Sequence, residues 1–182
     1  SQQSLYRILY LNLLIALSIV LKVIPLPLGM SLAFVVPILT AALIHPYWGA
    51  LVGFFSVLIS AFVTGGIGPW TPIQMYLFVL IPALLIWVPV QMKTNKLFLM
   101  GYGILWGMLY GFLIGLYFWP MMSQPLSKEA QMDSFLLFYV STSLLWDLFR
   151  AGGNALFLFL LYTPFKQAIS HIESDIMTQW QR

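Results

Sequence analysis

Residues 47–64, YWGALVGFFSVLISAFVT, carry no charged side chain, and they lie within a longer uncharged stretch from Val23 to Met92. A helix at the surface of a soluble protein places charged and polar residues on the face that meets water. About 20 mostly apolar residues are enough to cross the hydrocarbon core of a bilayer. This stretch, together with the uncharged stretches 97–127 and 151–165, therefore predicts helices embedded in lipid.

The composition of the whole chain supports the same class. Of its 182 residues, 61% are hydrophobic and only 7% are charged, with a net charge of +3. A soluble domain carries about 25% charged residues. The shortage of charge excludes a water-soluble enzyme or a nucleic-acid-binding protein, and the high apolar fraction excludes disorder. The chain has no cysteine, which excludes disulfides and thiolate metal sites.

Glycine and proline residues divide the uncharged stretches into segments. We expect an all-α integral membrane protein with six transmembrane helices in a single domain, residues 1–182. The second and third helices are expected to meet at His45–Pro46, and the last to end at Thr163–Pro164. The polar tail is expected to be an interfacial amphipathic helix or a solvated segment. The expected helices span about 5–22, 32–44, 47–64, 72–92, 97–119 and 132–162, and the tail spans 165–182.

The positions of the charged residues predict how the chain is oriented. Six helices place both termini on one side of the membrane, and cytoplasmic loops carry an excess of Lys and Arg. The side with the termini would hold Arg7, Lys93, Lys96, Lys166 and Arg182, against Lys22 and Lys128 on the other. Both termini are therefore expected in the cytoplasm.

Two charged residues fall inside the last expected helix. Asp147 and Arg150 are expected near the middle of the bilayer, where each costs about 2.5–3.5 kcal/mol on insertion scales. Their spacing of three places them on one helical face, where they can pair. Ser143 and Asn154 extend that face into a polar stripe. The stripe is either a structural ion pair that holds helices together or a patch that faces a substrate.

The loop 64–72, TGGIGPWTP, is the second candidate site. Its glycines and prolines predict a tightly shaped turn rather than a flexible linker. Trp70 is either an interfacial anchor or a ring that packs on a flat ligand, while Thr71 is a possible helix cap. Gly66, Gly68 and Gln74 accompany them as candidate substrate contacts.

No combination of residues indicates an enzyme. The sequence contains no nucleophile with its base, no paired catalytic carboxylates and no Walker motif. The chain therefore has no visible means to hydrolyse ATP, and any active transport would draw on an ion gradient or on a partner. Six aromatic residues are candidates for the wall of an outward-facing pocket: Trp106, Tyr110, Tyr117, Trp119, Tyr139 and Trp146.

Three stretches resemble the substrate-binding S components of energy-coupling factor (ECF) vitamin transporters. GIGPWTPIQM at 66–75 resembles the segment between helices three and four of one branch of S components. WDLFRAGGN at 146–154 is similar to the Asp-x-x-His-Ala-x-x-Asn pattern of that branch, with Arg150 in place of His. NLLIA at 12–16 is similar to a small-x-x-x-small docking motif, with Asn12 in place of the usual Ala. The size and the helix count also match over nearly the whole chain.

The resemblance implies a mechanism. An S component binds a vitamin from outside the cell, topples in the prokaryotic plasma membrane while docked to a transmembrane coupling subunit, and releases the vitamin inward as two partner ATPases hydrolyse ATP. It is not itself an enzyme. On this chain Asn12 and Ala16 would dock the partner. The loops 23–31, 65–71 and 120–131 would close the pocket.

The branch that carries the loop motif resembles S components for cobalamin or related corrinoids. Cobalamin is therefore the expected ligand, with riboflavin, folate or queuosine as alternatives, and no covalently bound cofactor is expected. His45 and His171 are expected on the cytoplasmic side, so no metal ligand is predicted. A self-sufficient ion-coupled transporter that uses Asp147 is the alternative from another class. The expected substrate contacts are Gly66, Gly68, Trp70, Thr71, Gln74, Tyr139, Asp147, Arg150 and Asn154.

Overall fold

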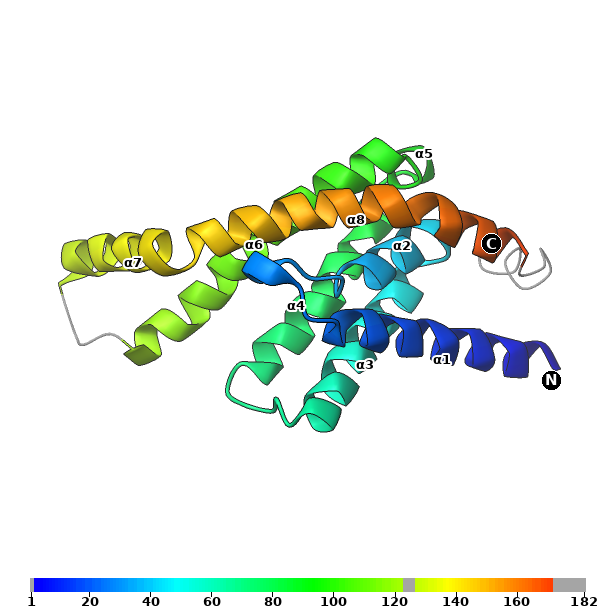
Figure 1. Cartoon of the computed structure of the whole chain (residues 1–182), viewed down its shortest axis with the longest axis horizontal. Coiled ribbons are helices and arrows are strands. Elements are labelled where there is room, and N and C mark those ends of the chain that lie inside the picture. Colours follow the sequence, from blue (N-terminus) through cyan, green and yellow to red (C-terminus); the bar gives the residue numbers. More distant parts are fainter. Residues whose placement is uncertain (1, 123–126, 172–182) are drawn as a thin grey trace.

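The computed structural model describes residues 2–122 and 127–171, and within these ranges every regular element is a helix. The longest helices lie across and beside one another in a single bundle (Figure 1). The elements are α1 (Gln2–Val23), the 3-10 turn η1 (Pro27–Gly29), α2 (Val35–Leu43), α3 (Pro46–Thr64), α4 (Thr71–Ala83), the 3-10 turn η2 (Leu84–Trp87), α5 (Val90–Lys93), α6 (Lys96–Met122), α7 (Lys128–Thr142) and α8 (Leu144–Ser170).

The short helix α2 forms the centre of the bundle. Eight of its nine residues are buried, and they contact α1, α3, α4 and α8. A helix that is apolar on all sides is stable only where other elements cover every face. The helices α2 and α3 are separated at His45–Pro46. Pro46 begins α3, and His45 Nδ1 accepts a hydrogen bond from the Tyr47 amide at 3.1 Å. This is the place where the sequence predicts the division.

Four helices are long and apolar enough to cross a membrane, namely Ser4–Val23, Pro46–Thr64, Lys96–Pro120 and Leu144–Ser170. The stretch Thr71–Trp87 is a shorter apolar helix. With nine residues, α2 extends only about 14 Å, less than half the thickness of the hydrocarbon core. The all-helical class is thus confirmed for the described residues, while six crossings stay a prediction.

The structure corrects three helix boundaries. Residues 132–162 do not form one helix, because the chain breaks at Ser143 (φ −120°, ψ −33°) between α7 and α8. The last helix does not end at Pro164, which lies inside α8. In the expected helix 72–92, α4 continues directly into η2, and the extended residues Val88 and Pro89 separate η2 from α5. Part of the expected tail, 172–182, lies outside the described residues.

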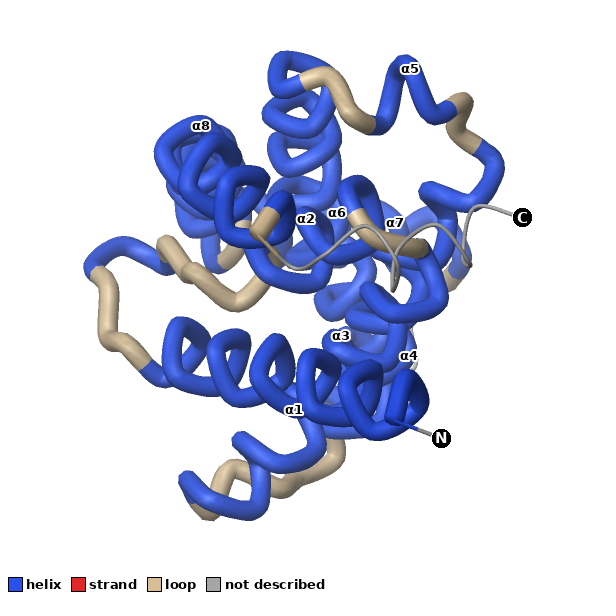
Figure 2. Tube along the Cα trace, turned by 90° about the vertical axis from the view of Figure 1, so that its right-hand side faces the viewer, coloured by secondary structure: helices blue, strands red, loops and turns tan. Residues whose placement is uncertain are grey.

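The start of α1 and the end of α8 lie at the same end of the molecule (Figures 1 and 2). A cleft lined by His45 and Lys93 separates α2 from α5. Burial, and then the nearby charge of Lys93, lower the pKa of His45 below its ordinary value, which keeps its ring neutral at pH 7. Which side of the membrane faces the end that holds the start of α1 and the end of α8 stays a prediction.

Candidate functional site

Glycine residues on α6 let the backbone of α8 approach closely, and the two helices together form one wall of the candidate site. A methyl group added to Gly107 would collide with the backbone of Ala151, and one added to Gly111 would collide with the carboxylate of Asp147. Small residues spaced by four let membrane helices approach closely. Sequence reasoning missed this role of α6, although the spacing of Gly103, Gly107, Gly111 and Gly115 is readable in the sequence.

The predicted pair of Asp147 and Arg150 is present, but its place in the helix differs from the prediction. Arg150 Nη1 lies 2.5 Å from Asp147 Oδ1 and 3.3 Å from the Gly107 carbonyl oxygen. The Asp147 side chain is 1% exposed and that of Arg150 is 17% exposed. Because the chain breaks at Ser143, Asp147 lies in the first turn of α8 rather than mid-helix. The positive end of the helix dipole stabilises a carboxylate at this position.

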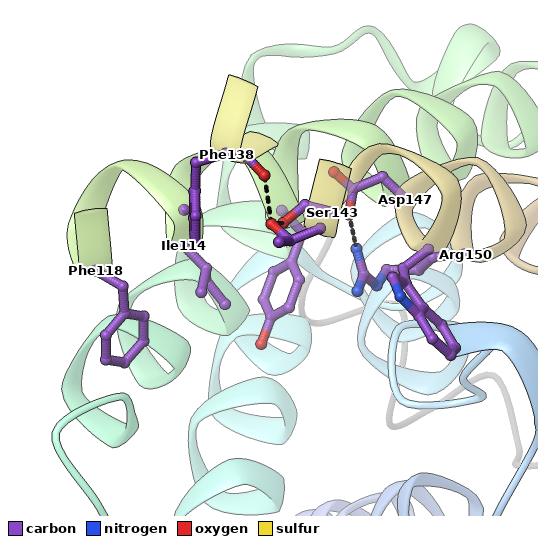
Figure 3. A pocket seen from close by; sticks show the side chains of 11 residues that line it. Ile114, Phe118, Phe138, Ser143, Asp147 and Arg150 are labelled. Atoms are coloured by element: carbon purple, nitrogen blue, oxygen red, sulfur yellow. Dashed lines mark hydrogen bonds and ion pairs between the residues drawn. The ribbon is translucent and has the colours of Figure 1, made fainter. Parts of the chain in front are cut away.

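A cavity of about 360 Å³ lies beside this pair, between α6, the end of α7 and the start of α8 (Figure 3). Its apolar wall includes Ile114, Phe118 and Phe138 together with aromatic rings of Tyr110 and Trp146. Its polar wall combines the ion pair with the hydroxyl-bearing residues at the helix break. The complete lining is Tyr110, Gly111, Ile114, Gly115, Phe118, Phe138, Thr142, Ser143, Trp146, Asp147 and Arg150.

An aromatic cluster supports the base of the cavity. Phe34 stacks on Phe78 with ring centroids 4.8 Å apart, and both rings meet the edge of Tyr110. Arg150 lies over the Tyr110 ring at 5.4 Å. Gln74 interacts with the Tyr110 hydroxyl, so this predicted residue reaches the site through Tyr110 rather than by lining the cavity. The cluster joins α2, α4 and α6 beneath the pair.

The loop after α3 does not line the cavity. Trp70 folds back over Gly68, and its indole N–H donates to the Gly66 carbonyl oxygen at 3.0 Å. The Gly68 amide donates to the hydroxyl of Thr71 at 3.0 Å. The Tyr117 hydroxyl, from α6, donates to the Pro69 carbonyl oxygen at 3.1 Å. The loop is thus a bonded turn fastened to α6, as its composition predicts, but the side chains of Trp70 and Thr71 bond to the backbone of the loop itself.

The loop after α1 reaches α8 at the edge of the cavity. Gly29, with a φ of +81°, lies against the Trp146 side chain, and Met30 packs on Gly153. Because Trp146 lines the cavity, a movement of this loop would alter the cavity wall. Of the third expected lid, 120–131, residues 123–126 lie outside the described residues.

The remaining predicted residues have other roles. Asn154 is fully buried, and its Nδ2 donates to the Gly103 carbonyl oxygen at 3.0 Å, so it joins α8 to α6 below the cavity. Tyr139 interacts with the Asp147 carboxylate from α7. Asn12 and Ala16 are exposed on the outer face of α1. The described residues contain no group of three His, Cys, Asp or Glu side chains that could hold a metal ion.

A family model described as "ECF transporter, substrate-specific component" matches residues 7–162 of the chain. This range contains every residue that lines the cavity. The corresponding comparisons with curated proteins and with solved structures give no match.

Proposed function

Because the chain belongs to the family of ECF transporter substrate-specific components, we propose that it captures a vitamin outside the cell in the cavity beside Asp147 and Arg150. Members of this family are membrane-embedded, substrate-binding subunits of a transport system and are not themselves enzymes. They work with an ECF transmembrane component and ATPase components. The observation that carries the proposal is an aromatic cavity with a buried ion pair in its wall, since such charges inside a membrane protein mark pathways.

The position of the cavity supports capture from outside. Gly111 lies 15 residues beyond Lys96 on α6, about 22 Å along the helix axis. Lys96, Lys93 and Lys166 belong to the end that the distribution of charge assigns to the cytoplasm. The cavity would then lie in the outer half of the membrane. The loops after α1 and α3, which contact or adjoin its walls, would close over a bound vitamin.

For the substrate, we propose cobalamin or a related corrinoid first, with riboflavin, folate and queuosine as the alternatives. The loop motif at 66–75 supports the first, whereas the size of the cavity is an argument for a smaller ligand. At about 360 Å³, it is at the lower end of the range for small-molecule sites. A flavin or pterin ring would fit between the aromatic walls as they stand. A corrinoid would require α7 and the α1 loop to move outward.

A binding screen of the purified chain tests the function. We expect one of cyanocobalamin, riboflavin, folate and queuosine to bind with a Kd of about 1 µM or tighter, measured by calorimetry in detergent. Uptake into liposomes should require the coupling and ATPase subunits together with ATP. Uptake by the chain alone, driven by a proton or sodium gradient, would instead support the ion-coupled transporter that uses Asp147.

Replacing Ala16 with tryptophan should separate docking from substrate binding. Ala16 lies on the exposed face of α1, away from the cavity, and a bulky ring there would hold a partner helix off the surface. We expect at least a 10-fold loss of coupling subunit that copurifies with the chain, while vitamin affinity stays within about twofold. Leu5→Trp, which changes an exposed residue nearer the start of α1, is the matched control. Normal copurification of the Ala16 variant would show that this face does not dock the partner.

A further inference from the structure

The two oxygens of the Asp147 carboxylate have unequal surroundings. Oδ1 accepts the hydrogen bond of Arg150, whereas Oδ2 is buried and has no hydrogen-bond partner among the described residues. A buried acceptor on a charged group is costly when it is left without a donor. Asp147 lines the cavity, so a molecule in the cavity can supply that donor.

Neighbouring groups are already engaged or badly placed to supply it. Gly111 faces the carboxylate from α6 and contributes no side chain. The Thr142 hydroxyl donates to the Phe138 carbonyl oxygen of its own helix. Tyr139 approaches the carboxylate from α7 but leaves Oδ2 without a hydrogen bond. Tyr139 is therefore the competing donor that an experiment must exclude.

Arg150 places a donor beside this acceptor. A guanidinium group has five N–H donors, and both hydrogen bonds that the structure gives Arg150 use Nη1. The side chain is partly exposed and lines the same cavity as Asp147 (Figure 3). Further N–H groups of Arg150 can therefore meet a carbonyl oxygen on a bound molecule.

The charges in the cavity wall cancel, and this limits what can bind. Asp147 and Arg150 are the charged residues in the lining, and they pair with each other. A carboxylate or phosphate entering this space would lose its hydration without a free counter-charge. A neutral amide carries an N–H donor and a C=O acceptor side by side, which complements the free acceptor of Asp147 and the free donors of Arg150.

We infer that the part of the substrate seated against this pair is a neutral carboxamide or lactam. Its N–H donates to Asp147 Oδ2, and its carbonyl oxygen accepts from Arg150. The inference rests on the proposed function, because it names the chemical class that the transport site recognises. It applies equally to the amide side chains of a corrinoid and to the ring lactam of a flavin or pterin.

The test compares each vitamin that binds in the four-ligand screen with its analogue methylated at the amide nitrogen. Loss of a hydrogen bond to a charged group should weaken binding about 10–100-fold. The same pair of ligands is then measured on Asp147→Asn and on Asp133→Asn, an exposed carboxylate of α7. We expect the methylation penalty to shrink to within about threefold in Asp147→Asn and to persist in Asp133→Asn.

Each outcome decides a separate point. A penalty that persists in Asp147→Asn is steric or belongs to another group such as Tyr139, and it overturns the inference while the transport function stands. Equal binding of parent and methylated vitamin to the native chain does the same. If Asp147→Asn does not fold, the native chain still decides, because the methylated vitamin should bind about 10–100-fold more weakly than its parent. For a corrinoid, the acid made by hydrolysing a side-chain amide should bind more weakly still, and equal or tighter binding overturns the inference. Failure of all four vitamins overturns the proposed function as well.

Discussion

Replacing Gly53 with alanine is expected to lower the free energy of unfolding by about 3 kcal/mol, because no space exists for a methyl group there. Gly53 lies on α3, and an added Cβ would collide with the backbone carbonyl of Phe78 on α4. Backbone atoms cannot rotate away as a flexible side chain can, so the two helices must separate. Phe78 also belongs to the aromatic cluster under the cavity, so the damage should reach the site.

Melting of the purified chain in detergent measures this effect. A loss of about 3 kcal/mol corresponds to a fall in Tm of about 6–12 °C for a chain of this size. Gly101→Ala and Gly152→Ala are the controls, since a Cβ at either position meets nothing within 4 Å. These two should be neutral or stabilising by up to about 1 kcal/mol, because alanine is the better helix former. If Gly53→Ala melts with the controls, the close approach of α3 and α4 is wrong.

The membrane class and several helix ends follow from simple sequence features. Lack of charge is enough to predict lipid-embedded helices, and Pro46 marks the start of α3 because a proline at the first helical turn loses no hydrogen bond. The break at Ser143 is marked less clearly, since neither glycine nor proline stands there and Ser143, although a residue type common at helix starts, forms no side-chain cap bond to α8. It arises where α7 packs its aromatic residues on Phe112 and Trp119 of α6 and α8 begins a new direction. Local sequence does not encode that choice.

The candidate site also combines features that the sequence predicts with features that only the packing of the helices determines. Asp147 and Arg150 are found from sequence because a charge in a membrane is expensive and must have a partner. The cavity beside them is not, because it depends on where the break at Ser143 and the glycines of α6 leave space. The Trp70 loop is identifiable as a shaped turn, but its Trp70 and Thr71 side chains bond to the backbone of the loop, and no spacing rule shows that in advance. The energetic cost of charge in a membrane therefore makes the pair predictable from the sequence, whereas the cavity depends on how the helices pack.

Removing Arg150 should be the most damaging single change at the site. In Arg150→Met the Asp147 carboxylate would stay buried without its counter-ion, which costs about 3–5 kcal/mol. The expected fall in Tm is about 6–20 °C. Lys128→Met, which removes an exposed cation at the start of α7, should change stability by no more than about 0.5 kcal/mol. Equal stability of the two variants would contradict a buried pair.

The double variant Asp147→Asn/Arg150→Met then distinguishes the two roles that the pair can have. With both charges removed, no uncompensated charge remains, and most of the lost stability should return. If the pair only holds α8 against α6, vitamin binding should return with the stability. If the pair recognises substrate, the double variant should fold with a native-like Tm and still bind its vitamin at least about 10-fold more weakly, because the charged carboxylate acceptor is replaced by a neutral amide and the guanidinium donors are gone. We expect the second result, since a purely structural pair gives no reason for Asp147 to keep an unpaired oxygen in the wall of a cavity.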